Sequence, residues 1–324
     1  MTTRRQFLAA SGAALAAPAV AQAPQAASLR LNWLLYGFHA PFLYGVERGL
    51  YREAGVDLTV GEGQGSARAV QIVAAGSDTF GLSDGTSIIA GAARGAPLRA
   101  VMGIMNRSPF AVIVREDSGI RVMADLRGKT IAATTGEAGL TIFPALLRAN
   151  KMGADDVRFL RVDGAGKMVA TLEGRTVGLL GGFENQALVL PQRGTPVRSL
   201  LYADNGVNTV GLAIHTTRET QARNPDLVRR FVAATRRAFE QAEREPEAAI
   251  DALLKVKPDF DRALSLAQLK AGMTLMRSAR AMDKPIGAMA PEDWSETLAL
   301  MKEFQELRTD LPAEAFYTNE FAPA

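Results

Sequence analysis

The sequence predicts an α/β protein with two lobes, each built on a mainly parallel sheet flanked by helices, followed by a helical C-terminal tail. From Leu29 onward, short apolar stretches alternate with amphipathic helical stretches, which is the rhythm of βαβ units. The rhythm starts afresh at residues 107–117, which indicates a second unit. After residue 217 the pattern is helical only, which predicts a tail of helices.

In the first unit, strands are expected where short apolar runs end at turn residues, at residues 28–34, 56–63, 80–85 and 98–104. Helices are expected between them, at residues 40–55, 67–76 and 86–95. The helix over 40–55 starts at an Ala-Pro pair and ends at Gly55, as helices commonly do.

In the second unit, strands are expected at residues 111–114, 157–162 and 176–182. Residues 124–139 are expected to hold a further strand, a glycine-rich turn and the start of a helix, and helices are expected over 166–174 and 183–194. A strand at 208–217 precedes the tail. The tail helices are expected at 227–245, 246–256, 262–282 and 291–307, the first of them begun by Asn224 and Pro225.

These units predict how the chain divides into domains. Because later strands usually pair with neighbours already in place, we expect residues 111–114 and 211–217 to be the two crossings between lobes. We assign residues 1–28 to an export signal and short leader, residues 29–112 plus 213–324 to a discontinuous first lobe, and residues 113–212 to the second lobe.

Composition excludes several classes of protein. The chain has 324 residues, 48% hydrophobic and 22% charged, with a net charge of +3 and no cysteine. No Lys/Arg block alternates with aromatics, so no nucleic-acid partner is expected. Two histidines and no cysteine argue against a metal site, and no Ser-His-Asp order with a nucleophile elbow is present. We therefore predict no catalytic residues and no cofactor.

The first residues have the plan of an export signal. Arg4 and Arg5 precede an apolar stretch from Phe7 to Val20, and small residues lead to Ala21, the expected cleavage point. The arginine pair resembles a twin-arginine signal. A membrane anchor is the alternative, but the apolar stretch is too short to span about 30 Å. A soluble periplasmic protein starting near Gln22 is predicted, with its charge lowered from +3 to +1 by loss of the two arginines.

A cluster of aromatic residues at 31–42, LNWLLYGFHAPF, follows the first expected strand. Open α/β folds bind ligands beyond the carboxyl ends of their strands. There, Trp33 and Phe38 offer rings for stacking, and His39 offers a hydrogen-bonding group near neutral pH. Alternatively the rings fill the space between strand and helix, which we expect of Phe42 and Tyr44.

Ser83 and Asp84 close another expected strand and open a helix. Asp84 is either a helix N-cap or a ligand group in the cleft. His215, in the later strand, is expected to be structural.

Thr135, Gly136 and Glu137 form a glycine-rich turn into a helix in the second unit. Such a turn presents free backbone N–H groups, which favours an anion. Glu137, however, adds a carboxylate that would repel an anion, so the turn favours a ligand with N–H donors. Glu137 pointing to solvent is the alternative.

A third group follows two glycines at a strand end. Phe183, Glu184 and Asn185 can cover a ring and hydrogen-bond its edge, or else form a tight turn with Asn185 as helix cap. Asn208, before the last expected strand, is a further cleft candidate or a turn residue.

Together these motifs resemble a known family. LNW, FHAPF, GLYREAGVDLTV, FGLSDGTSI, DLRGKTIAATTG, TLEGRTVGLLGGFEN and YTNEF are similar to the substrate-binding proteins of ABC importers in the NMT1/THI5-like, thiamine-pyrimidine group, over residues 29–321. DLRGKTIA is shared with related sulfonate, taurine and nitrate binders.

The resemblance implies a type II periplasmic clamshell that closes on a small-molecule ligand and delivers it to a membrane permease. We expect the protein to be a monomer. The resemblance also implies a thiamine-precursor pyrimidine as ligand. Aliphatic sulfonates, nitrate, other small organic anions and riboflavin are the alternatives. The same group includes pyrimidine-synthesising enzymes that use pyridoxal phosphate and a cysteine-rich motif, which a chain without cysteine lacks.

Overall fold

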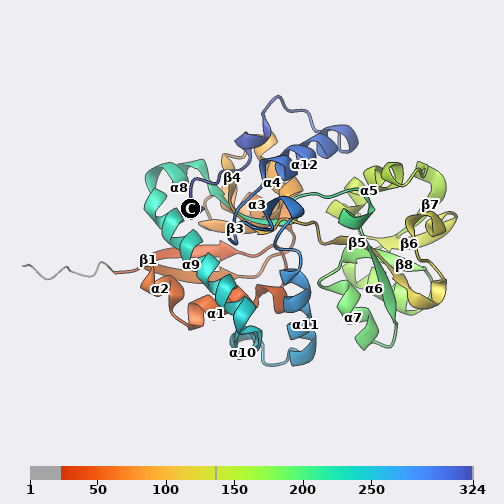
Figure 1. Ribbon diagram of the computed structural model, residues 1–324, viewed down its shortest axis with the longest axis horizontal. Helices are drawn as coiled ribbons and strands as arrows, with labels where there is room; N and C mark the ends of the chain where they lie inside the picture. The colour runs from red at the N-terminus through yellow and green to blue at the C-terminus, as the bar shows by residue number, and fades with distance from the viewer. Residues whose placement is uncertain (1–22, 136, 323–324) are drawn as a thin grey trace, which may run out of the picture.

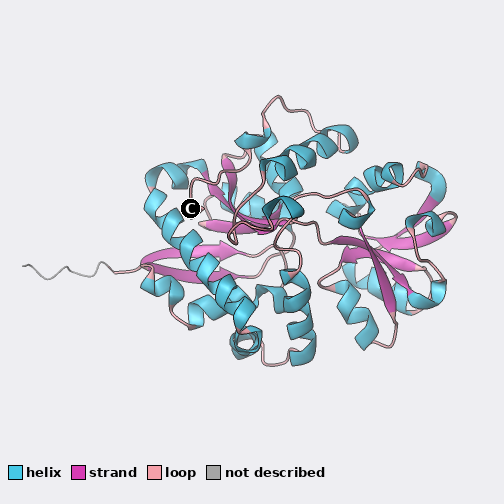
Figure 2. Cartoon of the chain, viewed as in Figure 1, coloured by secondary structure: helices cyan, strands magenta, loops and turns pink. Residues whose placement is uncertain are grey.

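Two lobes lie side by side in the computed structural model, which describes residues 23–135 and 137–322 (Figure 1). Each lobe contains one five-stranded sheet with helices on its faces (Figure 2). This confirms the predicted α/β class.

The first sheet has the strand order β2-β1-β3-β10-β4, with β10 antiparallel to both neighbours and the β1 pairings with β2 and β3 parallel. Its strands are β1 (Gln25–Arg30), β2 (Val56–Gly61), β3 (Phe80–Asp84), β4 (Leu98–Met105) and β10 (Leu212–Thr217). Because β1 begins at Gln25, residues 25–28 belong to this sheet and not to a leader. The predicted export signal falls in residues 1–22, which lie outside the described residues.

The second sheet repeats the plan in the order β7-β6-β8-β5-β9, with β5 antiparallel to β8 and β9. Its strands are β5 (Phe110–Arg115), β6 (Lys129–Ala133), β7 (Val157–Arg161), β8 (Gly178–Gly182) and β9 (Val197–Leu201). In both sheets the antiparallel strand is the one that follows a crossing from the other lobe.

The helices cover the sheet faces of both lobes (Figure 2). The first lobe has α1 (Ala40–Glu47), α2 (Leu50–Glu53), α3 (Ser66–Ala74), α4 (Gly85–Ala93), α8 (Arg218–Arg223), α9 (Pro225–Arg244), α10 (Pro246–Val256), α11 (Arg262–Met273) and α12 (Pro291–Phe304). The second has α5 (Ala138–Ala149), α6 (Gly164–Leu172) and α7 (Gln186–Gln192). The helix predicted over 40–55 is divided in two because Gly49 adopts a left-handed φ of 74°.

Helix α9 shows why the tail belongs to the first lobe. Its apolar residues recur at helical spacing and are buried on one face, and Phe231 stacks on Phe80 of β3 with ring centroids 3.9 Å apart. Burying one such side chain stabilises the fold by about 1.5–3 kcal/mol. The tail also reaches the second lobe, since Gln305 donates to Thr141 of α5 over 3.1 Å.

Two connections join the lobes, residues 106–109 and residues 202–211. The expected crossings, 111–114 and 211–217, instead lie almost wholly within β5 and β10 of single sheets. The two connections are held together because Asn208 Oδ1 accepts from Ser108 N over 2.9 Å. They also approach closely at Gly211, where a Cβ would lie 2.4 Å from Arg107 O.

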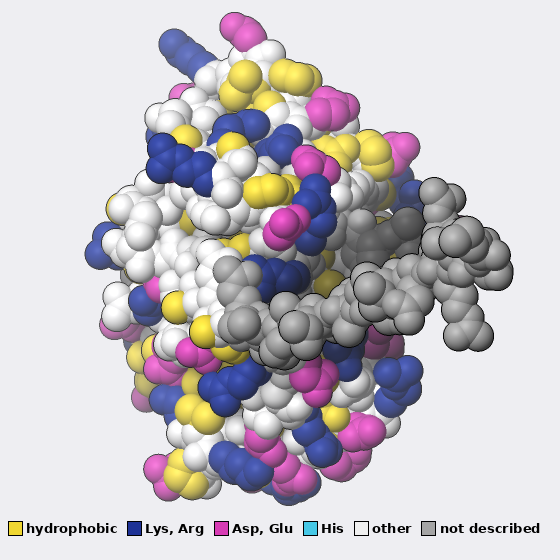
Figure 3. Space-filling view, turned by 90° about the vertical axis from the view of Figure 1, so that its left-hand side faces the viewer, with side chains coloured by type: hydrophobic (Ala, Val, Ile, Leu, Met, Phe, Trp, Pro, Cys, Tyr) yellow, Lys and Arg dark blue, Asp and Glu magenta, His cyan; other side chains and the backbone are white. Residues whose placement is uncertain are grey.

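The surface of the first lobe is mixed in charge. Figure 3 shows acidic and basic side chains interspersed over the end of this lobe, outside the part that is not described.

No helix within the described ranges has the length and apolar character needed to span a membrane.

Candidate functional site

The loop after β1 is fixed at the carboxyl edge of the first sheet. Asn32 O and Trp33 O accept from the amides of Gly65 and Gly63, over 2.8 and 2.9 Å. A Cβ at Gly63 would lie 1.8 Å from the carbonyl oxygen of Leu31, so only glycine allows this contact. Trp33 is 43% exposed on this loop, which leaves its ring accessible.

Phe38 does not lie where the sequence suggested. Its ring is fully buried, edge-to-face with Phe239 at 5.8 Å, and lies against the Cα of Gly272. The 3-10 turn Gly37–His39 directs the ring into the core of the first lobe. Phe38 is therefore a core residue in this structure, as are Phe42 and Tyr44.

His39 is also buried, and it forms a hydrogen bond with the loop that follows β1. Its Nε2 lies 3.0 Å from Asn32 Oδ1, and the ring of Tyr36 packs against its edge at 4.4 Å. Burial lowers the pKa of His39 to about 3, so the imidazole is neutral and does not titrate near neutral pH as expected from the sequence.

Asp84 is a helix cap. Its carboxylate accepts from Ser87 N and Ser87 Oγ, over 2.9 and 2.8 Å, at the start of α4. Ser83 is buried and bonds His215 Nε2 over 2.9 Å, and burial lowers the pKa of His215 to about 3. The polar groups of this strand end are thus used inside the first lobe.

Glu137 lies at the N-cap position of α5. Its Oε1 accepts from Thr134 N over 2.9 Å, and its Oε2 pairs with Lys167 Nζ over 2.5 Å. Lys167 was not singled out in the sequence. Because it neutralises Glu137, the argument that an unpaired carboxylate repels anions here is corrected. Thr135 is exposed, and Gly136 lies outside the described residues.

Glu184 lies at one of the contacts between the lobes. Tyr36 of the first lobe donates its hydroxyl to Glu184 Oε1 over 3.2 Å, and Glu184 is only 6% exposed. Burial raises the pKa of Glu184 to about 7. Its Oε2 is buried without a partner among the described residues and lies close to Gly182, where a Cβ would come within 2.8 Å.

A second bridge lies beside the first. Gln268 of α11 accepts from Gly37 N over 3.0 Å and donates to Asn185 Oδ1 over 3.0 Å. Asn185 lies at the N-cap position of α7 without a capping bond from its side chain. Phe183 is half-buried against the apolar core.

Comparisons with known proteins show which family the chain belongs to. The model of the protein family described as "NMT1/THI5 like" matches residues 37–249, which is well over half of the chain. The chain belongs to the NMT1/THI5-like family. It is 26% identical to the riboflavin-binding protein RibY of Chloroflexus aurantiacus, over 95% of this chain and 91% of that protein. It is 24% identical to a 4-amino-5-hydroxymethyl-2-methylpyrimidine phosphate synthase of Legionella pneumophila, over 91% of this chain and 92% of that protein.

Among solved structures, the fold is that of the periplasmic aliphatic sulphonate binding protein SsuA from Escherichia coli. The TM-score is 0.72 at 18% identity, covering 91% of this chain and 92% of that one. This likeness confirms the predicted two-lobed periplasmic-binding-protein fold.

In this NMT1/THI5-like protein, the predicted residues divide into three groups. Glu184 and Asn185 are joined to the first lobe through Tyr36 and Gln268, neither of which was predicted. Trp33 and Thr135 are exposed. The remaining described residues make contacts within one lobe or in the lobe connections, as given above for Phe38, His39, Ser83, Asp84, Glu137, Phe183 and Asn208.

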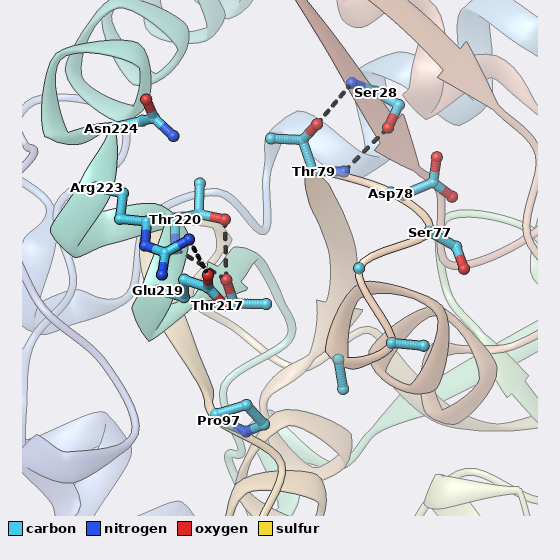
Figure 4. Close-up of a pocket in the computed structure, with 13 residues that line it drawn as sticks. Ser28, Ser77, Asp78, Thr79, Pro97, Thr217, Glu219, Thr220, Arg223 and Asn224 are labelled. Carbon is cyan, nitrogen blue, oxygen red and sulfur yellow. Dashed lines mark hydrogen bonds and ion pairs between the residues drawn. The ribbon is translucent and has the colours of Figure 1, made fainter.

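A separate depression of about 500 Å³ lies between the 74–79 segment and the start of α8 (Figure 4). Ser28 and Thr79 at its wall exchange two hydrogen bonds of 3.2 and 3.0 Å. None of the predicted site residues lines it. Two pairs of its polar side chains, Thr217 with Thr220 and Glu219 with Arg223, are bonded to each other, and we do not take this depression as the candidate site.

Proposed function

We propose that this protein is the periplasmic solute-binding component of an ABC importer, and that it captures a small nitrogen-containing heteroaromatic ring by hinge closure. The ligand we favour is a thiamine-precursor pyrimidine. The observation that carries the proposal is the pair of bridges between the lobes, Tyr36–Glu184 and Gln268–Asn185. They bring a buried acid and two amides together where the lobes meet, and such groups can recognise the edge of a ring.

We propose lobe boundaries at 106–109 and 202–211, near the earlier division into 29–112 plus 213–324 and 113–212. Short connections held together by Asn208 suit rotation of one lobe against the other. A ligand held by groups of both lobes would favour the closed population. In this proposal the protein acts as a monomer and delivers its ligand to a membrane permease.

Riboflavin is the second candidate, because the relative from Chloroflexus aurantiacus is named a riboflavin-binding protein. Its fused ring also carries N–H donors and acceptors along one edge. An aliphatic sulfonate or nitrate is a third candidate, suggested by the SsuA fold and by the neutralisation of Glu137 by Lys167. The competing proposal is that the protein is an enzyme, because several relatives are named as pyrimidine phosphate synthases.

Titration calorimetry with 4-amino-5-hydroxymethyl-2-methylpyrimidine, riboflavin, an alkanesulfonate and nitrate tests the proposal. We expect the pyrimidine to bind at one site per chain. Trp33→Ala should weaken this binding by about 1–3 kcal/mol, the scale of stacking on an aromatic ring. Trp294 is fully buried, so the ligand-dependent fluorescence change should come from Trp33. If only the sulfonate binds tightly, the ligand is an anion and the pyrimidine assignment is wrong.

A further inference from the structure

The bridge between Gln268 and Asn185 has a fixed hydrogen-bonding polarity. Gly37 N is a backbone amide and can only donate, so the group of Gln268 that faces it must be the carbonyl Oε1. Gln268 Nε2 then faces Asn185, which must offer Oδ1 in return. The backbone N–H group of Gly37 therefore determines which atoms of Gln268 and Asn185 donate and which accept in this bridge.

This polarity leaves Asn185 Nδ2 as the group not used by the bridge. Asn at an N-cap position usually turns its oxygen to the helix amides. Asn185 makes no such bond at the start of α7, because its oxygen is engaged by the other lobe. Within residues 23–135 and 137–322, Asn185 Nδ2 has no hydrogen-bond partner.

The neighbouring residue offers the opposite chemistry. Glu184 is more than nine-tenths buried, its Oε1 accepts from Tyr36, and its Oε2 has no partner among the described residues. An unpaired buried acceptor is costly, and a ligand that supplies a donor removes that cost. Consecutive residues thus present one acceptor and one donor.

We propose that Gln268 is a positioning residue that sets the specificity of the site, by holding Asn185 so that its Nδ2 donates to the ligand beside the Glu184 acceptor. The inference rests on the proposed function and names its ligand class: a planar ring with an N–H donor next to a nitrogen or oxygen acceptor. An aminopyrimidine edge and the imide edge of a flavin both have this pair. A sulfonate or nitrate offers acceptors only, and it leaves the Glu184 carboxyl group unmatched.

Gln268→Glu tests the inference with almost no change of shape. A glutamate offers two acceptors, so one oxygen keeps the bond from Gly37 N and the other turns Asn185 to donate toward it. Asn185 would then present Oδ1 to the ligand. Two probes report this change in weakly alkaline buffer: 4-amino-2-methylpyrimidine, and 3-methylaniline, which keeps the amino group but lacks the ring-nitrogen acceptors.

We expect the ratio of the two affinities to fall about tenfold in Gln268→Glu, the value of one hydrogen bond. Asn185→Asp removes the same donor while keeping Gln268 and Gly37 bonded, so it should give the same fall even if the first variant folds poorly. Gln71→Glu, the same change at an exposed position of α3, should leave the ratio at its wild-type value.

An unchanged ratio in both site variants, with normal pyrimidine binding by the wild type, would overturn the role of Gln268 and leave the proposed function standing. If the wild type binds neither the pyrimidine nor riboflavin, the proposed function and the inference both fall. The wild-type titration therefore separates the two failures.

Discussion

The hydroxyl of Tyr36 in the first lobe donates to Glu184 Oε1 in the second over 3.2 Å, although the two residues are 148 positions apart in the chain. Both side chains are buried. This bond and the adjacent Gln268–Asn185 bond tie the lobes together in the present conformation, so the same residues should influence stability, lobe separation and ligand binding.

Tyr36→Phe should separate the lobes. Removing the hydroxyl leaves Glu184 Oε1 buried and unpaired, at a cost of about 1–3 kcal/mol in the free energy of unfolding or of lobe closure. Small-angle scattering should show a larger radius of gyration for the ligand-free variant.

Tyr51→Phe is the matched control for that change. Tyr51 OH bonds Thr235 over 3.2 Å within the first lobe, so its loss should lower stability without changing the radius of gyration. An identical scattering curve for Tyr36→Phe and wild type would contradict the role assigned to the Tyr36–Glu184 bond.

Glu184 should make stability depend on pH. Burial raises its pKa from 4.5 to about 7, so the folded protein keeps a proton that the unfolded chain releases between these values. Stability therefore falls as pH rises from about 4.5 to 7, by an amount on the order of 3 kcal/mol, and the loss is complete above pH 7.

The measurement is the difference in unfolding free energy between wild type and Glu184→Gln across this range. The difference removes the effect of His39 and His215, whose pKa values are lowered to about 3 and which destabilise the protein as pH falls below 6.5. A difference that does not change with pH would show that Glu184 is solvated in the folded protein.

Gly272→Ala should destabilise the first lobe. A Cβ at this position would lie 2.1 Å from the ring of Phe38, which is itself enclosed by the core. Overpacking of this kind costs about 1–3 kcal/mol, measurable by urea denaturation. Gly164→Ala at the start of α6 meets open space and should cost nothing, so equal stability of the two variants would mean that Phe38 can move aside.

Lys167→Met should leave Glu137 without its partner. The side chain of Lys167 is 7% exposed, so the lost bond to Glu137 should cost about 1.5–3 kcal/mol in the free energy of unfolding, the value of a hydrogen bond between charged groups. Arg175→Met is the control, because it breaks an exposed pair with Glu173 that should contribute less than about 1 kcal/mol. If both variants lose the same small amount, Glu137 is solvated without Lys167.

The sheets and most helices could be predicted because they follow from local patterns. The alternation of apolar strands with amphipathic helices is present in the sequence itself, and it restarts where the second sheet begins. Boundaries were less accurate. The strand expected over 28–34 is β1 at Gln25–Arg30, because the carbonyl groups that follow it bond to the loop after β2.

The candidate site was predicted only in part, for a physical reason. Glu184 and Asn185 were found from their place after two glycines at a strand end. Gln268 has no comparable signal, because it lies on a tail helix and meets Asn185 only through a contact 83 residues away. Tyr36 was within the aromatic cluster, but its partner could not be read from local sequence.

Mass spectrometry of the protein after incubation with the ligand panel tests the central claim most directly. The protein is equilibrated with the pyrimidine, riboflavin and an alkanesulfonate together, separated gently from free solutes, and the retained molecule is weighed before and after release. The account predicts one heteroaromatic molecule per chain, recovered with its mass unchanged. Retention of the sulfonate alone, or recovery of a chemically altered pyrimidine, would contradict it.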